Sequence, residues 1–332
     1  MKAIVYHNYG SPDVLRCEEI EKPTVGDNEV LIEVRAASVN PLDWHFVRGT
    51  PYFLRMMAGL RKPKIIRLGA DVAGRVEAVG RNVTQFKPGD EVFGTTRGAF
   101  AEYVRADERR LALKPAHLTF EQAAAVPVAG LTALQGLRDK GRIQPGQKVL
   151  INGAAGGVGT FAVQIAKSFG ADVTGVCSTR NVDMVRSIGA DHVIDYTKED
   201  FAQSGQRYDL IFDNVGNRSF SDCRRVMVTK GILVSNGGGS LKENEGRWLG
   251  PITGSIAALA LTPFVSQKIV TFLASITKDN LGVLKELMEA RKVTPVIDRC
   301  YTLSEVPEAI RYLEEGHARG KVVITMEHNS KT

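Results

Sequence analysis

The chain has 332 residues, of which 43% are hydrophobic and 24% are charged. This length predicts about two domains, and the composition is that of a folded globular protein, which excludes a disordered or fibrous chain. The net charge of +6 favours phosphorylated ligands, but no basic stripe alternates with aromatic residues, so we predict no nucleic-acid partner.

The sequence predicts neither a secretion signal nor an integral membrane segment. The start MKAIVYHNYG lacks the apolar core of a signal peptide. The apolar stretch 251–276 is interrupted by Pro263, Gln267 and Lys268, so we interpret it as buried core or a subunit contact. The four cysteines are far apart in the sequence, which fits free thiols in a reducing compartment, and we expect a cytoplasmic protein.

The first third of the chain is typical of a β-rich domain. The expected strands are 2–6, 29–39, 71–80, 90–95 and 99–106. Because turns rich in Gly, Pro and Asp separate them, we predict an antiparallel, partly barrel-like arrangement. A polar turn, SVNPLDWHFVRG, is expected at 38–49; Asp43 is expected to hold it by accepting from backbone N–H groups, and Trp44 to pack.

From about residue 119 the pattern changes to helices alternating with apolar strands. A helix capped by Thr119 is expected at 119–139, interrupted by Pro127. The strands that follow are expected at 147–153, 172–178, 192–196, 209–216 and 232–238, and the helices at 158–170, 181–190 and 220–231. Apolar strands alternating with helices predict a parallel sheet covered on both faces.

The last part of the chain is expected to return to the first domain. It holds a strand at 268–275, a helix at 278–291, a further strand, a helix capped by Ser304 and a closing strand in RGKVVITM. The predicted fold class is therefore α/β, with a doubly wound Rossmann sheet inserted into a β-rich domain. We expect the β-rich domain at 1–125 and 276–332, and the Rossmann domain at 126–275.

The strongest chemical motif is VLINGAAGGVGTFAVQIAK at 149–167, in which a strand, a glycine-rich turn and a helix follow one another. This order is what a dinucleotide pyrophosphate requires, because glycines admit the phosphates to the free N–H groups of the helix start. The first glycine of the usual pattern is replaced by Ala154. We predict that the cofactor binds at Ala155, Gly156, Gly157, Val158 and Gly159.

The end of the second Rossmann strand predicts NADPH rather than NADH. An NAD site usually has Asp or Glu here for the ribose 2′-hydroxyl, whereas this chain has Ser178 and Arg180. A serine and an arginine suit a 2′-phosphate, and Tyr196 at the end of the next strand can reach the same region. Arg180 as a solvent-facing residue at a helix start is the alternative.

These motifs together resemble the medium-chain dehydrogenase/reductase superfamily, in its zinc-free quinone oxidoreductase branch. The likeness covers nearly the whole chain and includes plant envelope quinone oxidoreductase homologues and bacterial relatives. It is carried by SVNPLDW (38–44), GADVAGRVEAVG (69–80), FKPGDEVFG (86–94), AAAVPVAGLTALQGL (123–137), INGAAGGVG (151–159) and GHARGKVVI (316–324). The resemblance implies that the β-rich domain is a GroES-like catalytic domain.

The resemblance also implies further cofactor contacts. Asn40 is expected to face the nicotinamide and its ribose, and Lys321 to close over the cleft. The other expected contacts are Thr132, Asn214, Val215, Gly216, Asn236 and Gly237.

The resemblance argues against a metal, because zinc members have a cysteine where this chain has Asn40. They also have a Gly–His–Glu segment, which here is Gly69–Ala70–Asp71. Asp43, His45 and Asp71 remain an alternative ligand set. Without zinc, oxidation of a simple alcohol is disfavoured, and a quinone or an α,β-unsaturated carbonyl is the easier hydride acceptor.

Hydrogen-bond donors to the acceptor oxygen are expected from Asn40, Tyr52 and Tyr103. Tyr52 lies in RGTPYFLRMMAG, interpreted as a loop that either walls the acceptor pocket or packs on the core. His45 remains either structural or a proton donor. The prediction is an NADPH-dependent reductase of small-molecule quinones, enones or alkenals, acting as a homodimer through the edge strand 268–275. The alternatives are a zinc-free carbonyl or alcohol dehydrogenase and a non-catalytic NADPH-binding interaction protein.

Overall fold

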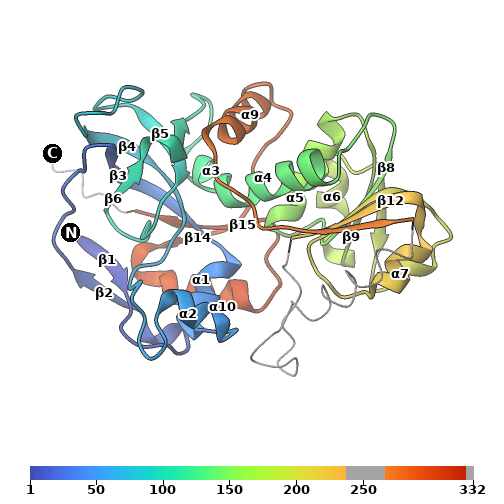
Figure 1. Cartoon of the computed structure of the whole chain (residues 1–332), viewed down its shortest axis with the longest axis horizontal. Helices are drawn as coiled ribbons and strands as arrows, with labels where there is room; N and C mark the ends of the chain where they lie inside the picture. The colour runs from blue at the N-terminus through green and yellow to red at the C-terminus, as the bar shows by residue number, and fades with distance from the viewer. Residues whose placement is uncertain (237–265, 327–332) are drawn as a thin grey trace. The chain divides into compact units, whose positions relative to one another are not determined.

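The computed structural model describes residues 1–236 and 266–326 (Figure 1). Gly237 and most of the apolar stretch 251–276 lie outside this part. The chain divides into two compact units: Met1–Val128, Ile276–Ala290 and Pro295–Thr332 form the first, and Ala129–Ser275 with Arg291–Thr294 form the second. The expected boundaries did not include the brief return of 291–294 to the second unit.

The first unit is built on a seven-stranded mixed sheet, the GroES-like domain expected from the sequence. The strand order is β14-β15-β3-β4-β5-β7, with β6 also paired to β3. Its strands are β3 (Glu29–Val39), β4 (Asp71–Val79), β5 (Glu91–Thr95), β6 (Tyr103–Asp107), β7 (Leu111–Leu113), β14 (Ile297–Thr302) and β15 (Lys321–Thr325). A separate hairpin pairs β1 (Lys2–Val5) with β2 (Arg16–Glu19).

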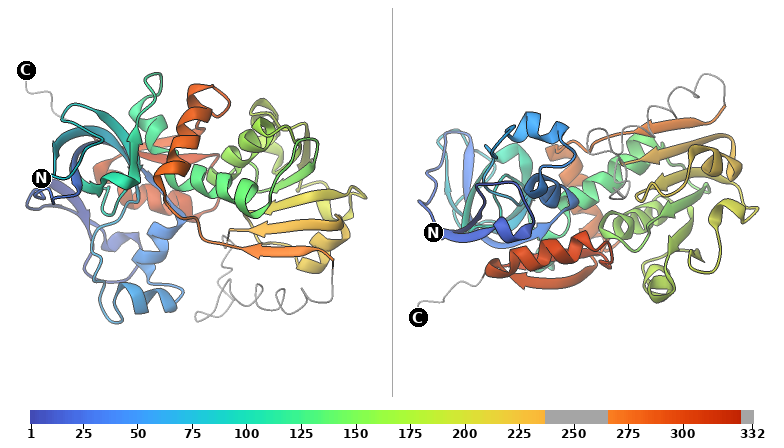
Figure 2. Two further views of the ribbon diagram at one scale, coloured as in Figure 1. Left: turned by 45° about the horizontal axis from the view of Figure 1, so that its top comes forward. Right: turned by 90° about the horizontal axis from the view of Figure 1, so that it is seen from below.

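Strand β3 holds the first unit together because it pairs with three other strands. It runs antiparallel to β4, β6 and β15, so a strand from the chain's C-terminal part completes the domain. The helices of this unit are α1 (Pro41–Arg48), α2 (Phe53–Ala58), α3 (Phe120–Ala124), α9 (Lys278–Glu289) and α10 (Val306–Glu314). Figure 2 shows α10 beside β14 and β15, which it contacts.

The second unit is a six-stranded parallel sheet in the order β10-β9-β8-β11-β12-β13, the Rossmann order. Its strands are β8 (Lys148–Asn152), β9 (Asp172–Cys177), β10 (His192–Asp195), β11 (Tyr208–Asp213), β12 (Met227–Ser235) and β13 (Lys268–Thr271). Its helices are α4 (Pro127–Leu134), which starts at the boundary, α5 (Gly157–Ser168), α6 (Val182–Ser187) and α7 (Phe220–Arg225).

Three sequence expectations about local structure were wrong. Within the segment 38–49, residues 41–48 form helix α1 rather than a turn, since Pro41 opens the helix and Gly49, at φ 60°, ends it. Residues 53–58 form α2 rather than a loop. The helix expected at 220–231 ends at Arg225, because Met227 and the residues after it pair with β11 as strand β12. That pairing overrides local helix propensity.

A smaller correction concerns the C-terminal helix. Thr302, not Ser304, is the N-cap, and it caps a short 3-10 helix, Leu303–Glu305, that leads into α10. The Glu305 carboxylate accepts from the backbone N–H and from the hydroxyl of Thr302, each at 2.8 Å. Thr119 caps α3 as expected, by accepting from the N–H of Gln122.

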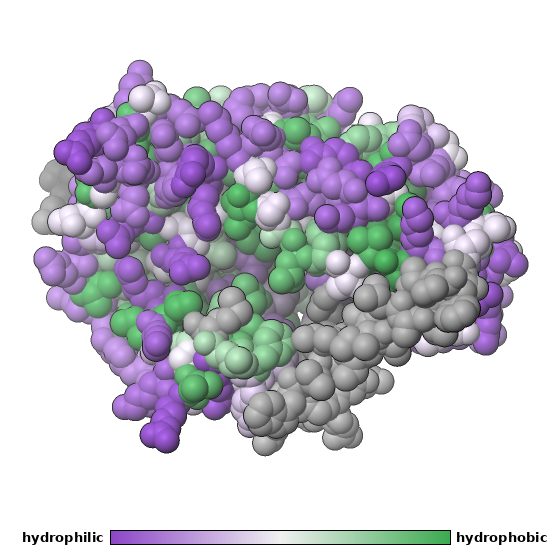
Figure 3. Space-filling view, viewed as in Figure 1, coloured by the Kyte–Doolittle hydropathy of each residue, from purple (hydrophilic) through white to green (hydrophobic). Residues whose placement is uncertain are grey.

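No helix in the described ranges is long and apolar enough to cross a membrane. On the face in Figure 3, hydrophobic residues are scattered among hydrophilic ones.

Candidate active site

Three strand ends bring a polar cluster together inside the first unit. Asn40 follows the last residue of β3, Asp71 opens β4 and Lys321 opens β15. Because β3 is antiparallel to both neighbours, the end of β3 meets the starts of β4 and β15. All three residues are buried, with exposed fractions of 3%, 0% and 3%.

The Lys321 ammonium lies among three oxygen atoms. Its Nζ is 2.7 Å from Asn40 Oδ1, 3.2 Å from the Val39 carbonyl oxygen and 3.5 Å from Asp71 Oδ2. Burial lowers the pKa of Lys321, and the carboxylates of Asp71 and Asp43 oppose that shift. Three oxygen acceptors match the three protons of the ammonium. The expected contact of Lys321 with a cofactor stays a prediction.

The Asp71 carboxylate is the acceptor at the centre of the cluster. Its Oδ2 accepts from Ser38 Oγ at 2.7 Å and from Asn40 Nδ2 at 2.9 Å, and its Oδ1 accepts from the N–H of Val128 at 2.9 Å. The Asn40 amide is thus held from both ends, by an acceptor at its nitrogen and a cation at its oxygen. Its weakest contact joins Nδ2 to the Ser38 carbonyl oxygen at 3.4 Å.

Asp43 fixes the start of α1, as the sequence predicted. Its carboxylate accepts from the backbone N–H of Asn40 at 2.8 Å and of Gly69 at 3.0 Å. Burial raises its pKa to about 6, although both hydrogen bonds oppose the shift. Trp44 packs on the core and its ring stacks on His45.

His45 is held by Thr50, whose carbonyl oxygen lies 2.9 Å from its Nδ1, and burial lowers the pKa of the imidazole. The alternative metal set of Asp43, His45 and Asp71 therefore has its oxygens and one ring nitrogen already hydrogen-bonded. Within residues 1–236 and 266–326, no three His, Cys, Asp or Glu side chains are grouped to hold a metal ion.

Of the two tyrosines predicted to assist Asn40, Tyr103 lies in another part of the first unit. Tyr103 pairs with Glu33 on β3, about seven positions or roughly 20 Å along the strand from Asn40, and its ring lies under the Lys22 ammonium. The structure therefore does not bring Tyr103 to the cluster. Tyr52 precedes α2, and its ring lies 4.8 Å from the Arg55 guanidinium.

The glycine-rich turn of the second unit lies between β8 and α5. Gly156 is the residue before the helix, and a Cβ added there meets nothing nearer than the Gly153 carbonyl oxygen at 3.5 Å. A Cβ on Gly159 would lie 2.0 Å from that same oxygen. Gly159 is thus required for helix packing, whereas Gly156 leaves space at the helix N-terminus that fits a phosphate. Ala155 precedes Gly156 in the turn, and Gly157 and Val158 open α5.

The end of β9 carries the residues predicted to select NADPH. Ser178 and Arg180 follow Cys177, and Arg180 and Tyr196 are exposed. Asp195, which ends β10, was not predicted as part of this site from the sequence. Thr179 and Thr197 donate to its carboxylate at 2.6 and 2.7 Å, and these bonds lower its pKa well below the ordinary range.

A second buried carboxylate shapes the loop after β11. Asp213 Oδ1 accepts from Asn152 Nδ2 at 2.9 Å and from the N–H groups of Val215 and Gly216, each at 3.0 Å. This oxygen ties the predicted cofactor loop 214–216 to the strand that precedes the glycine-rich turn. The Asn214 Oδ1 in turn accepts from Asn236 Nδ2 at 2.7 Å.

Thr132, a predicted cofactor contact, is buried on α4. Apart from its place at a strand end, no motif in the sequence indicated the role of Asp213.

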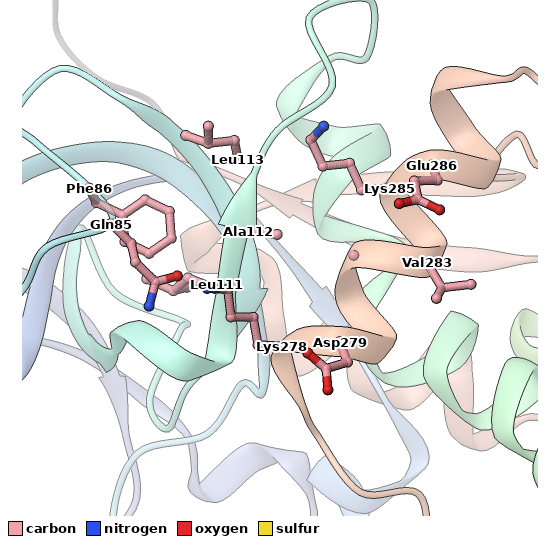
Figure 4. Close-up of a pocket in the computed structure, with 11 residues that line it drawn as sticks. Gln85, Phe86, Leu111, Ala112, Leu113, Lys278, Asp279, Val283, Lys285 and Glu286 are labelled. Atoms are coloured by element: carbon pink, nitrogen blue, oxygen red, sulfur yellow. The ribbon is translucent and has the colours of Figure 1, made fainter.

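A groove in the first unit has a different character. It lies between β7 and α9, with a volume of about 510 Å³ (Figure 4). Apolar side chains and the charged ends of α9 line it: Phe86, Leu111, Leu113, Lys278, Val283 and Glu286. No residue predicted for catalysis or cofactor binding is among the residues that line it.

Two family models match separate parts of the chain. Residues 26–116 match the alcohol dehydrogenase GroES-like domain, and residues 188–324 match a family described as zinc-binding dehydrogenase. The chain is 36% identical to 2-methylene-furan-3-one reductase of Solanum lycopersicum, over 98% of this chain and 79% of the relative. Identity and coverage are the same for the chloroplastic NADPH-dependent alkenal/one oxidoreductase of Arabidopsis thaliana.

Solved structures show the same fold. The quinone oxidoreductase of Coxiella burnetii has a TM-score of 0.85 and 31% identity, and the alignment covers 98% of this chain and 99% of that one. The Escherichia coli quinone oxidoreductase complexed with NADPH has a TM-score of 0.81 and 25% identity, with 98% and 100% covered. The chain therefore belongs to the medium-chain dehydrogenase/reductase superfamily, in the branch of quinone and alkenal/one oxidoreductases that use NAD(P)H.

Proposed function

We propose that this protein reduces quinones or the activated double bond of α,β-unsaturated carbonyl compounds with NADPH and without zinc. The observation that carries this proposal is the glycine-rich turn with open space at Gly156, combined with a buried polar cluster around Asn40. The names of the relatives support the acceptor class.

The residues of the second unit fit the cofactor. Backbone N–H groups at Gly156 and Gly157 would hold the pyrophosphate, and loop 214–216 would hold the nicotinamide side. When bound, the nicotinamide supplies a hydride to the acceptor. Ser178 and Arg180 would bind the 2′-phosphate. The Asp195 carboxylate, which would repel that phosphate, is already bonded by Thr179 and Thr197.

The residues of the first unit fit the acceptor. Reduction of an enone or a quinone places negative charge on an oxygen, and a donor held in place stabilises that charge better than mobile water does. The Asn40 N–H that now makes its weakest contact, 3.4 Å from the Ser38 carbonyl, is the donor we assign to this oxygen. The oxygens of Asp43 and Asp71 are bonded by N–H and O–H donors, which supports a reaction without zinc.

The proposal is tested by acceptor-dependent oxidation of NADPH against quinones, alkenals, enones and their saturated counterparts. We expect turnover with activated acceptors and little with saturated aldehydes and ketones. Turnover of saturated carbonyls at equal rates would instead indicate a carbonyl or alcohol dehydrogenase. The cytoplasmic location stays a prediction, because relatives include mitochondrial and chloroplastic proteins.

A further inference from the structure

Lys321 connects the last strand of the chain with the residue we assign to the acceptor. Its ammonium is 2.7 Å from Asn40 Oδ1, and the two residues are 281 positions apart in the sequence. An ammonium only donates and a carboxylate only accepts, so Lys321 and Asp71 together allow one orientation of the Asn40 amide. If the amide were flipped, its NH₂ group would face the ammonium.

The same domain contains a second buried lysine that serves as a comparison. The side chains of Lys114 and Lys321 are both 4% exposed. Lys114 bonds the Leu118 carbonyl oxygen at 2.6 Å and pairs with the Glu91 carboxylate at 3.1 Å. Neither partner belongs to the Asn40 cluster. The two lysine side chains are therefore equally buried and each is paired with a carboxylate, but only Lys321 contacts Asn40.

We propose that Lys321 and Asp71 are positioning residues that fix the Asn40 amide for the acceptor. This inference rests on the proposed function, because the amide orientation matters for catalysis only if Asn40 meets the acceptor. Lys321 itself does not touch the acceptor. Lys321 bonds the amide oxygen of Asn40 and so fixes the orientation of the amide. The Asn40 N–H that faces the Ser38 carbonyl therefore keeps one direction.

The test separates positioning from stability. Lys321→Met leaves the Asp71 carboxylate buried without its cationic partner and is expected to destabilise the fold. The double variant Lys321→Met with Asp71→Asn removes both charges and recovers stability. We expect kcat of the double variant to stay about 10- to 100-fold below wild type, while the dissociation constant of NADPH changes less than threefold. Lys114→Met is the matched control, and we expect it to lose stability but keep kcat.

Chemical rescue supplies a readout that does not depend on turnover. Lys321→Ala leaves space where the side chain was, and ethylammonium chloride is expected to raise both the Tm and the kcat of this variant. Sodium chloride at equal concentration is expected to do neither.

Full turnover of the double variant, or equal loss of kcat in Lys114→Met, would overturn the positioning role while leaving the proposed function intact. A wild type that turns over no acceptor would contradict both.

Discussion

Burial and hydrogen bonding have opposite effects on the pKa of Asp43. Burial raises its pKa to about 6, against the N–H groups of Asn40 and Gly69. An unfolded aspartate titrates near pH 4, so the folded chain binds this proton more tightly between about pH 4 and 6. The stability from Asp43 is therefore present below about pH 4 and is lost as the pH rises through 6.

This shift predicts a difference between wild type and Asp43→Asn. The free energy of unfolding of wild type, relative to the variant, should fall by about 2 kcal/mol between pH 4 and 7, because asparagine does not titrate. Urea unfolding of both proteins at several pH values measures the difference. A constant difference would show that Asp43 titrates normally.

Arg180 is the single residue that we expect to decide the preference for NADPH over NADH. Arg180→Ala should weaken NADPH binding about 10- to 100-fold, the loss of a charge-assisted hydrogen bond, and leave NADH binding unchanged. Fluorescence titration with each coenzyme measures this effect. Arg142→Ala, an exposed arginine of the second unit, is the matched control. Equal losses for NADPH and NADH would remove Arg180 from 2′-phosphate recognition.

At the scale of elements, the glycine-rich motif that joins β8 to α5 contains two glycines with different roles, Gly156 before the helix and Gly159 in its first turn. A Cβ on Gly159 would collide with the Gly153 carbonyl oxygen at 2.0 Å, whereas one on Gly156 meets that oxygen at an ordinary 3.5 Å. Gly159 is needed for packing of the helix, and we propose that Gly156 leaves space for the cofactor phosphates. The sequence predicts the turn but cannot separate these tasks, because both positions match one motif.

This difference gives a paired prediction. Gly159→Ala should lower the free energy of unfolding by about 2 kcal/mol or more through overpacking. Gly156→Ala should change stability by less than about 1 kcal/mol but weaken NADPH binding about tenfold or more, because the methyl group fills the space for a phosphate. Urea unfolding and NADPH titration of both variants test the pair. Normal NADPH affinity in Gly156→Ala would place the phosphates elsewhere.

Strongly patterned elements were predictable from the sequence, and elements set by their neighbours were not. Strand β3 matches its expected range 29–39, since its apolar run is bounded by turn residues. Helix α7 was predicted too long because Met227 and its neighbours enter β12 through pairing with a distant strand. Helix α1 was missed because Asn40, Pro41 and Asp43 occur in turns as often as at helix starts.

At the scale of the whole molecule, the candidate site depends on contacts that sequence spacing does not reveal. Asn40, Asp71 and Lys321 meet because β4 and β15 both run antiparallel to β3. The sequence pointed to Asn40 and Lys321 through family motifs, but it gave them separate tasks. Their contact and the central place of Asp71 depend on strand order and register.

The homodimer expected from the sequence also remains a prediction at this scale. Strand β13 is at the edge of the parallel sheet and pairs on one side with β12. Light scattering should give twice the chain mass of 36.2 kDa. Ile269→Lys should yield monomers, because a charge on an edge strand opposes pairing. Leu113→Lys in the first unit is the control and should leave the dimer intact. A monomeric wild type would contradict the prediction that β13 forms the dimer contact.

The central claim is that the buried Asn40 amide acts on the hydride acceptor. The most direct measurement compares Asn40→Ala with wild type in single-turnover oxidation of NADPH by the best quinone or enone, alongside the dissociation constant of NADPH. We predict a rate about 100-fold lower, as for the loss of an oxyanion donor, with NADPH affinity within threefold of wild type. An Asn40→Ala variant that binds NADPH normally and keeps the full rate would contradict the claim.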